Sequence, residues 1–218
     1  MEKKYKYGYA FVLEGDTEKE FYYALLEHLC KKHDATISRI VDTTSPDISY
    51  ELQMGDEVVL IKFNTVNTIT QVPRTGKWFN IQCVSKYGSG ILWYVFLCYD
   101  KDDYKEDISK FHEGDWAVLR KSLKKAKQIV DVAAAADIED VMLQDINHVC
   151  HFLGCSPPVT LVGKKGKSKM KNLFKEHGMY YHEGKRARDL IGALDMDFLI
   201  DINIVPLKEI ERLLFNEL

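Results

Sequence analysis

The sequence has few cysteines, and they are not arranged as in a disulfide-stabilised or zinc-binding protein. The five cysteines are odd in number and scattered, and no two form a C-x-x-C pair. We therefore expect buried thiols and no disulfide framework. His148, Cys150, His151 and Cys155 lie close in the sequence but do not share one face of a helix, so a zinc site is not expected either.

Long hydrophobic runs are also absent. No stretch approaches the roughly 18 consecutive apolar residues of a membrane span. The opening residues, MEKKY, lack the apolar core of a signal peptide. We therefore expect a cytoplasmic protein with no membrane partner.

The chain lacks a P-loop, although residues 163–168 (GKKGKS) are rich in glycine and lysine. The motif G-x-x-x-x-G-K-[ST] would need glycine at position 161, where this chain has Leu161. An ATPase, if one assists this protein, would have to be a partner acting in trans.

A strong excess of one charge is missing too, since the net charge is −3. This value argues against a general, histone-like nucleic-acid binder. Positive charge is nevertheless concentrated between residues 164 and 188, either as a solvated basic loop or as contacts to the phosphate backbone of a nucleic acid. The candidate nucleic-acid-binding residues are Lys164, Lys165, Lys167, Lys169, Lys171, Lys185, Arg186 and Arg188.

Carboxylates follow two predicted strands of the chain. Glu14 ends a strand that begins at Tyr7, and Asp100 and Asp102 end an apolar run that begins near residue 91. In an open α/β sheet the carboxyl ends of neighbouring strands face one crevice, so these carboxylates would lie together. Clustered carboxylates suit Mg²⁺ or Mn²⁺, which commonly bind through one or two of them plus a substrate phosphate. The pattern predicts phosphoryl chemistry.

These motifs resemble those of the TOPRIM domain, which topoisomerases, DnaG-type primases and several nucleases share. The stretch EGDTE at residues 14–18, with Phe21 and Tyr22 after it, is similar to the E-G-x-T-E-x-x-[FY] opening of the OLD and RloB-like nucleases associated with phage defence. The resemblance covers roughly residues 7–145. The chain has no recognisable additional domain of a topoisomerase or primase, so those activities are not expected.

The resemblance implies a TOPRIM-like (Rossmann-like) α/β fold. We expect a mostly parallel sheet flanked by helices in residues 1–153 and a basic, mainly helical extension in residues 154–218. The implied activity is metal-dependent hydrolysis of phosphodiester bonds in DNA or RNA, in antiphage defence. A homodimer is compatible with the sequence.

The resemblance also implies roles for single residues. Glu14 matches a metal ligand or general acid/base, Asp100 and Asp102 match metal ligands, and Asp103 is an auxiliary ligand candidate. Glu18 is either metal-linked or a carboxylate favoured by the helix dipole.

Glu139 is a further catalytic candidate. The segment IEDV at residues 138–141 resembles a degenerate form of a Phe-Glu-x-Trp-like segment of RloB-like proteins, with Val141 in place of the aromatic residue. An acid-rich helix start is the alternative. We expect Glu14 or Glu139 to act as general base.

Two other functions remain open at this level. The chain could be a non-catalytic TOPRIM-like module that binds a partner protein, or a phosphohydrolase of small nucleotides. The presence of both acidic motifs favours catalysis.

Three local features are also predicted. Thr17 is expected to cap a helix over residues 18–32, with Glu20 completing a capping box. Residues 73–78 are expected to form a turn, and residues 138–152 one continuous helix.

Overall fold

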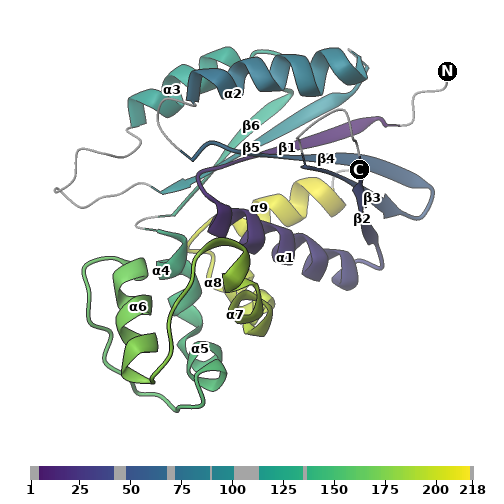
Figure 1. Cartoon of the computed structure of the whole chain (residues 1–218). Coiled ribbons are helices and arrows are strands. Elements are labelled where there is room, and N and C mark those ends of the chain that lie inside the picture. The colour runs from purple at the N-terminus through teal and green to yellow at the C-terminus, as the bar shows by residue number, and fades with distance from the viewer. Residues whose placement is uncertain are drawn as a thin grey trace. The chain divides into compact units, whose positions relative to one another are not determined.

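A computed structural model describes residues 5–41, 48–67, 72–88, 90–100, 113–134 and 137–216. These residues include a six-stranded sheet with the strand order β2-β3-β4-β1-β5-β6 (Figure 1). The strands are β1 (Tyr7–Leu13), β2 (Thr36–Ile40), β3 (Ile48–Met54), β4 (Glu57–Thr65), β5 (Leu92–Asp100) and β6 (Gln128–Ala134).

The centre of the sheet is parallel and one edge is antiparallel. Strand β1 pairs in parallel with both β4 and β5, whereas β2, β3 and β4 form an antiparallel meander. The amide of Lys127, just before β6, donates to the carbonyl of Trp93 near the start of β5, so these two strands begin at the same edge. The expected mixed α/β sheet, mostly parallel and flanked by helices, is confirmed; its assignment to the TOPRIM type stays a prediction.

Strand β1 is central because nearly all of it is apolar. Its residues from Gly8 to Leu13 are buried, as expected for a parallel strand covered on both faces. Tyr9 stacks on Tyr94 of β5 with ring centroids 5.2 Å apart, and Phe11 lies 4.7 Å from Phe96. These cross-strand aromatic pairs fix the register that places Leu13 opposite Cys98.

The described residues fall into two compact units. The first draws on residues 1–15, 26–98 and 109–131, and the second on residues 16–25, 99–108 and 132–218. The expected division at residue 153 stays a prediction, because compactness does not report which segments fold on their own.

In the first unit, helices α2 (Val72–Trp78) and α3 (Glu113–Ser122) lie side by side on one face of the sheet (Figure 1). The predicted turn at residues 73–78 is therefore wrong. Pro73 falls in the first turn, where a helix needs no amide donor. Gly76 is required by close packing, since a Cβ there would lie 2.2 Å from the Ser122 Oγ of α3.

The second unit is built mainly from short helices. The predicted continuous helix over residues 138–152 is wrong, because it divides at Asp145, whose side chain caps a new helix by accepting from the His148 amide. The helices are the first part of α1 (Asp16–Lys32), α4 (Ile138–Met142), η3 (Leu143–Asp145), α5 (Ile146–Phe152), α6 (Gly166–Glu176), η4 (Gly184–Ala187), α7 (Arg188–Ala193), α8 (Met196–Ile202), α9 (Leu207–Glu211) and η5 (Arg212–Asn216). Among the described residues, none of these helices is long and apolar enough to cross a membrane.

Candidate functional site

The predicted strand-end carboxylates follow two adjacent parallel strands. Glu14 comes directly after β1 and is half-buried, and its amide donates to the Cys98 carbonyl at 3.2 Å. Asp100 is the last residue of β5 and is buried, with 7% of its surface exposed. Strands β1 and β5 run in parallel, with Leu13 opposite Cys98, so both strands end at the same edge of the sheet. That the two carboxylates act together in one site stays a prediction.

The metal site itself stays a prediction. Asp102 and Asp103 lie outside the described residues. Within the described ranges, no three His, Cys, Asp or Glu side chains are grouped so that they could hold a metal ion.

Helix α1 begins differently from the prediction. Its N-cap is Gly15, which has extended backbone and no capping side chain. The Thr17 hydroxyl instead accepts from the Gly184 amide at 2.9 Å, and Glu20 accepts from the Arg188 guanidinium at 2.6 and 3.0 Å. The predicted capping box is therefore wrong, because both side chains are buried in contacts with the segment that opens η4 and α7.

Glu18 lies in the first turn of α1 but is not a solvated helix-start charge. Only 8% of its surface is exposed. Its negative charge is one of several that raise the pKa of the Tyr181 hydroxyl, after burial and the nearby Glu139. Glu18 thus belongs to the same charged environment as Tyr181, and its link to a metal stays a prediction.

Glu139 is a buried carboxyl at the start of α4. It is 4% exposed, and its Oε1 accepts a hydrogen bond of 2.8 Å from the Tyr181 hydroxyl. Burial raises the pKa of Glu139 to about 7, and the negative charge of Asp137 adds to this, whereas the Tyr181 hydroxyl and Lys167 act in the opposite direction. Glu139 can therefore take up or release a proton near neutral pH.

Asp137 and Tyr181 support Glu139 and were not predicted as site residues. Asp137 caps α4 by accepting from the Asp140 amide at 2.9 Å, and its other oxygen accepts from the Lys167 amide at 3.0 Å. An aspartate directly before an acid-rich helix start is a cap signal that the sequence does contain. Tyr181 carries no such signal, because it lies 42 residues from its partner.

Several of the predicted nucleic-acid-binding side chains form ion pairs within the second unit. Lys167 and Lys171 contact Glu183 at 2.5 and 3.1 Å, and Lys169 contacts Asp140 at 2.8 Å. Arg188 pairs with Glu20.

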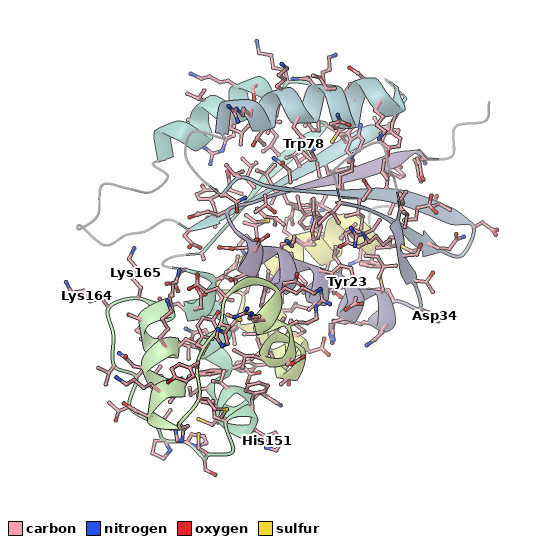
Figure 2. All side chains as sticks on the ribbon, in the orientation of Figure 1. Tyr23, Asp34, Trp78, His151, Lys164 and Lys165 are labelled. Atoms are coloured by element: carbon pink, nitrogen blue, oxygen red, sulfur yellow. The ribbon has the colours of Figure 1, made fainter. Side chains whose placement is uncertain are left out.

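The remaining predicted cations lie at the start of α6 and in η4. Lys164 and Lys165 lie at the start of α6, with Lys164 exposed and Lys165 half-buried (Figure 2). Lys185 and Arg186 are exposed and have no ion pair within the part of the chain that the structure describes. Fewer of the predicted cations are therefore available to a nucleic acid than the sequence indicates.

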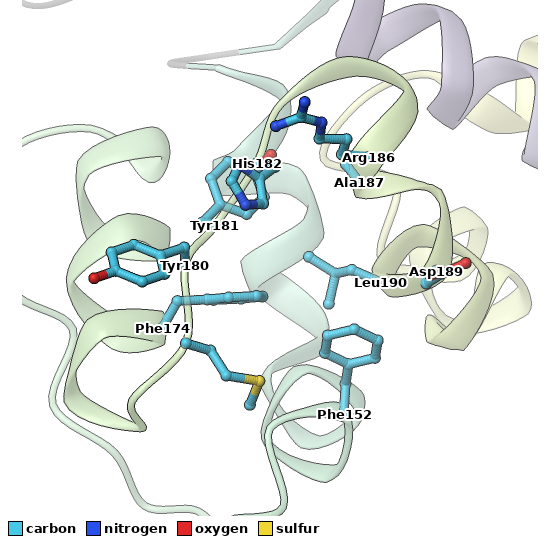
Figure 3. A pocket seen from close by; sticks show the side chains of 10 residues that line it. Phe152, Phe174, Tyr180, Tyr181, His182, Arg186, Ala187, Asp189 and Leu190 are labelled. Atoms are coloured by element: carbon cyan, nitrogen blue, oxygen red, sulfur yellow. The ribbon is translucent and has the colours of Figure 1, made fainter.

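An aromatic pocket of about 250 Å³ lies in the second unit (Figure 3). Phe152, Phe174, Tyr180 and Leu190 are among its walls. Tyr181 also lines the pocket with its ring, while its hydroxyl donates to Glu139. One side chain thus connects the pocket to the buried carboxyl.

No protein-family model and no curated protein matches this sequence. Among solved structures, a futalosine hydrolase mutant of Helicobacter pylori is 6% identical, with a TM-score of 0.26 over 91% of this chain and 99% of that one. A peptidyl-tRNA hydrolase is 14% identical, with a TM-score of 0.33 over 97% and 89% of the two chains. A Campylobacter jejuni 5'-methylthioadenosine/S-adenosyl homocysteine nucleosidase is 11% identical, with a TM-score of 0.28 over 95% and 99%. Similarities of this size assign no activity to the chain.

Proposed function

We propose that this protein is a metal-dependent hydrolase of phosphodiester bonds, a TOPRIM-type nuclease that acts in antiphage defence. The observation that carries the proposal is the pair of carboxylates, Glu14 and Asp100, that end two adjacent parallel strands. Residues at the carboxyl ends of such strands are where open α/β sheets bind their ligands.

The residues at these strand ends fit a hard divalent cation. Glu14 and Asp100 offer only carboxylate oxygens, and Mg²⁺ commonly takes one or two carboxylates together with substrate phosphate oxygens. Asp102, two residues beyond Asp100, would add a third carboxylate. Such an ion, when bound, would neutralise charge on the scissile phosphate and lower the pKa of a bound water.

Glu139 is the residue best suited to move a proton in this reaction. A general base works best when its pKa lies near the working pH, and burial brings the pKa of Glu139 to about 7. The Tyr181 hydroxyl holds Oε1 of that carboxylate in one orientation. Lys185 and Arg186 would contact backbone phosphates without reading bases.

The test is incubation of the purified protein with plasmid DNA, tRNA or nucleotides, each with Mg²⁺, Mn²⁺ or EDTA. We expect cleavage of a nucleic acid with either metal and none with EDTA. Asp100→Asn should abolish the cleavage, whereas Asp131→Asn, a matched change at an exposed carboxylate of β6 that pairs with Arg120, should not. Hydrolysis of nucleotides alone would assign the protein to small-molecule phosphohydrolases. No metal-stimulated hydrolysis of any substrate would contradict the proposal.

A further inference from the structure

The aromatic pocket of the second unit has walls suited to a flat ring. Phe174 is buried between Phe152 and Tyr181, with ring centroids 6.1 and 5.5 Å away. Leu190 closes another side (Figure 3). Tyr180 also lines the pocket yet is 82% exposed, so one large aromatic face is open to a ligand.

The lining of the pocket includes charged side chains. Arg186 lies beside His182, and Asp189 lies near Leu190 (Figure 3). Arg186 is exposed and forms no ion pair among the residues that the structure describes. The lining therefore offers a planar cation for an anionic group and a carboxylate acceptor for N–H donors.

We propose that this pocket binds a single nucleotide unit, with the base against Tyr180 and the phosphate at Arg186. A volume of about 250 Å³ lies below the usual range for drug-sized ligands and suits one ring system. Bases of single-stranded nucleic acids commonly stack on aromatic side chains, and guanidinium groups bind phosphate bidentately. The inference rests on the proposed function for its choice of a nucleotide over other aromatic anions.

Tyr181 gives the pocket a connection to the buried carboxyl. Its ring is part of the pocket wall, and its hydroxyl donates to Oε1 of Glu139. A base seated in the pocket would therefore touch the side chain that orients Glu139. The pocket thereby selects unpaired nucleotides, because a base within a duplex has no free face to offer.

Binding in EDTA tests the pocket apart from catalysis. Calorimetric titrations would compare a nucleoside, its 5′-monophosphate, a short single-stranded oligonucleotide and its duplex. We expect the monophosphate to bind more tightly than the nucleoside, and the single strand more tightly than the duplex. Tyr180→Ala should weaken binding of nucleoside, monophosphate and single strand about five- to hundredfold. Arg186→Gln should remove the preference for monophosphate over nucleoside.

Two matched variants serve as controls, and both should bind like the wild type. Phe198→Ala removes another partly exposed aromatic ring of the second unit, and Lys124→Gln removes an exposed cation of the first. Equal effects of Phe198→Ala and Tyr180→Ala, or no nucleotide binding at all, would contradict the proposal that this pocket binds a nucleotide. Binding of the monophosphate but not of the oligonucleotide would assign the pocket to free nucleotides. If the protein binds nucleotides in a way that depends on Tyr180 but cleaves no nucleic acid, the proposed function is wrong and the proposed nucleotide binding by the pocket is retained.

Discussion

Glu139 is a carboxyl whose affinity for a proton is set mainly by burial. The folded protein holds this proton with a pKa of about 7, against an ordinary value of 4.5. The folded state therefore binds more protons than the unfolded state between these two pH values, so this group lowers the free energy of unfolding as pH rises from about 4.5 to 7. A buried acid kept at this cost is a candidate for a functional residue.

Replacing the acid by its amide should remove this pH dependence. Glutamine can still accept the hydrogen bond from Tyr181, so Glu139→Gln should be more stable than the wild type above pH 7 by up to about 3 kcal/mol. The difference should vanish below pH 4.5. Urea unfolding across this pH range measures it, with Glu176→Gln, at an exposed glutamate, as control. Identical pH profiles of wild type and Glu139→Gln would show that Glu139 is not buried as described.

Glu14 and Glu18 should differ in their effect on catalysis. Glu14 follows β1 at the strand end, so Glu14→Gln should lower the cleavage rate by about 100-fold or more with little change in stability. Glu18 is buried in the first turn of α1, where loss of the dipole interaction costs up to about 2 kcal/mol. Single-turnover rates and melting temperatures of both variants test this. An equally complete loss of activity in a folded Glu18→Gln would assign Glu18 to the metal instead.

At the scale of elements, the start of α6 is fixed against the start of α4 by a glycine. A Cβ at Gly166 would lie 2.1 Å from the Asp140 amide nitrogen and 2.2 Å from Oδ1 of Asp137, which accepts from that amide. A larger residue must push these helix starts apart and disturb the cap beside Glu139.

We therefore expect Gly166→Ala to lower the free energy of unfolding by about 1–3 kcal/mol. Gly192→Ala is the matched control, because Gly192 is helical in α7 and a Cβ there meets no atom within 4 Å. This control should stabilise the protein by about 0.4–1 kcal/mol. Urea unfolding of both variants decides the matter, and equal stabilities would mean that α4 and α6 do not pack as described.

Elements with a strong local pattern could be predicted from the sequence, and those defined by distant contacts could not. Strand β1 and helix α1 were expected close to their observed bounds, because their apolar spacing is local. Strand β3 and helix α8 were missed. Helix α2 contains Pro73 and Gly76, which indicate a turn until its packing on α3 is known.

The same division applies to the candidate site. The placing of Glu14 and Asp100 at strand ends could be predicted, because Glu14 directly follows one apolar strand and Asp100 ends another. The partnership of Glu139 with Tyr181 could not, because it depends on how the second unit folds. Local rules favour a capping box at Thr17 and Glu20, but both side chains instead hydrogen-bond to residues far along the chain.

At the scale of the whole molecule, the distribution of paired and unpaired cations decides how nucleic acid would bind. Lys185 has no ion pair among the described residues, whereas Lys169 is paired with Asp140. Lys185→Gln should therefore weaken nucleic-acid binding to a similar degree for all sequences. It should also lower the salt dependence of binding by the equivalent of about one phosphate contact, and Lys169→Gln should lower it less. Fluorescence anisotropy at several salt concentrations gives both slopes. Equal slopes for wild type and Lys185→Gln would leave the segment a solvated basic loop.

We propose that the strand-end carboxylates hold a divalent cation for phosphodiester hydrolysis. This proposal is tested most directly by the cleavage rate of one labelled nucleic acid as a function of Mn²⁺ concentration, for wild type, Asp100→Asn and Asp131→Asn. We predict saturable activation of the wild type and of Asp131→Asn, and no activation of a folded Asp100→Asn at any concentration. The same activation curve for Asp100→Asn and the wild type would contradict the account.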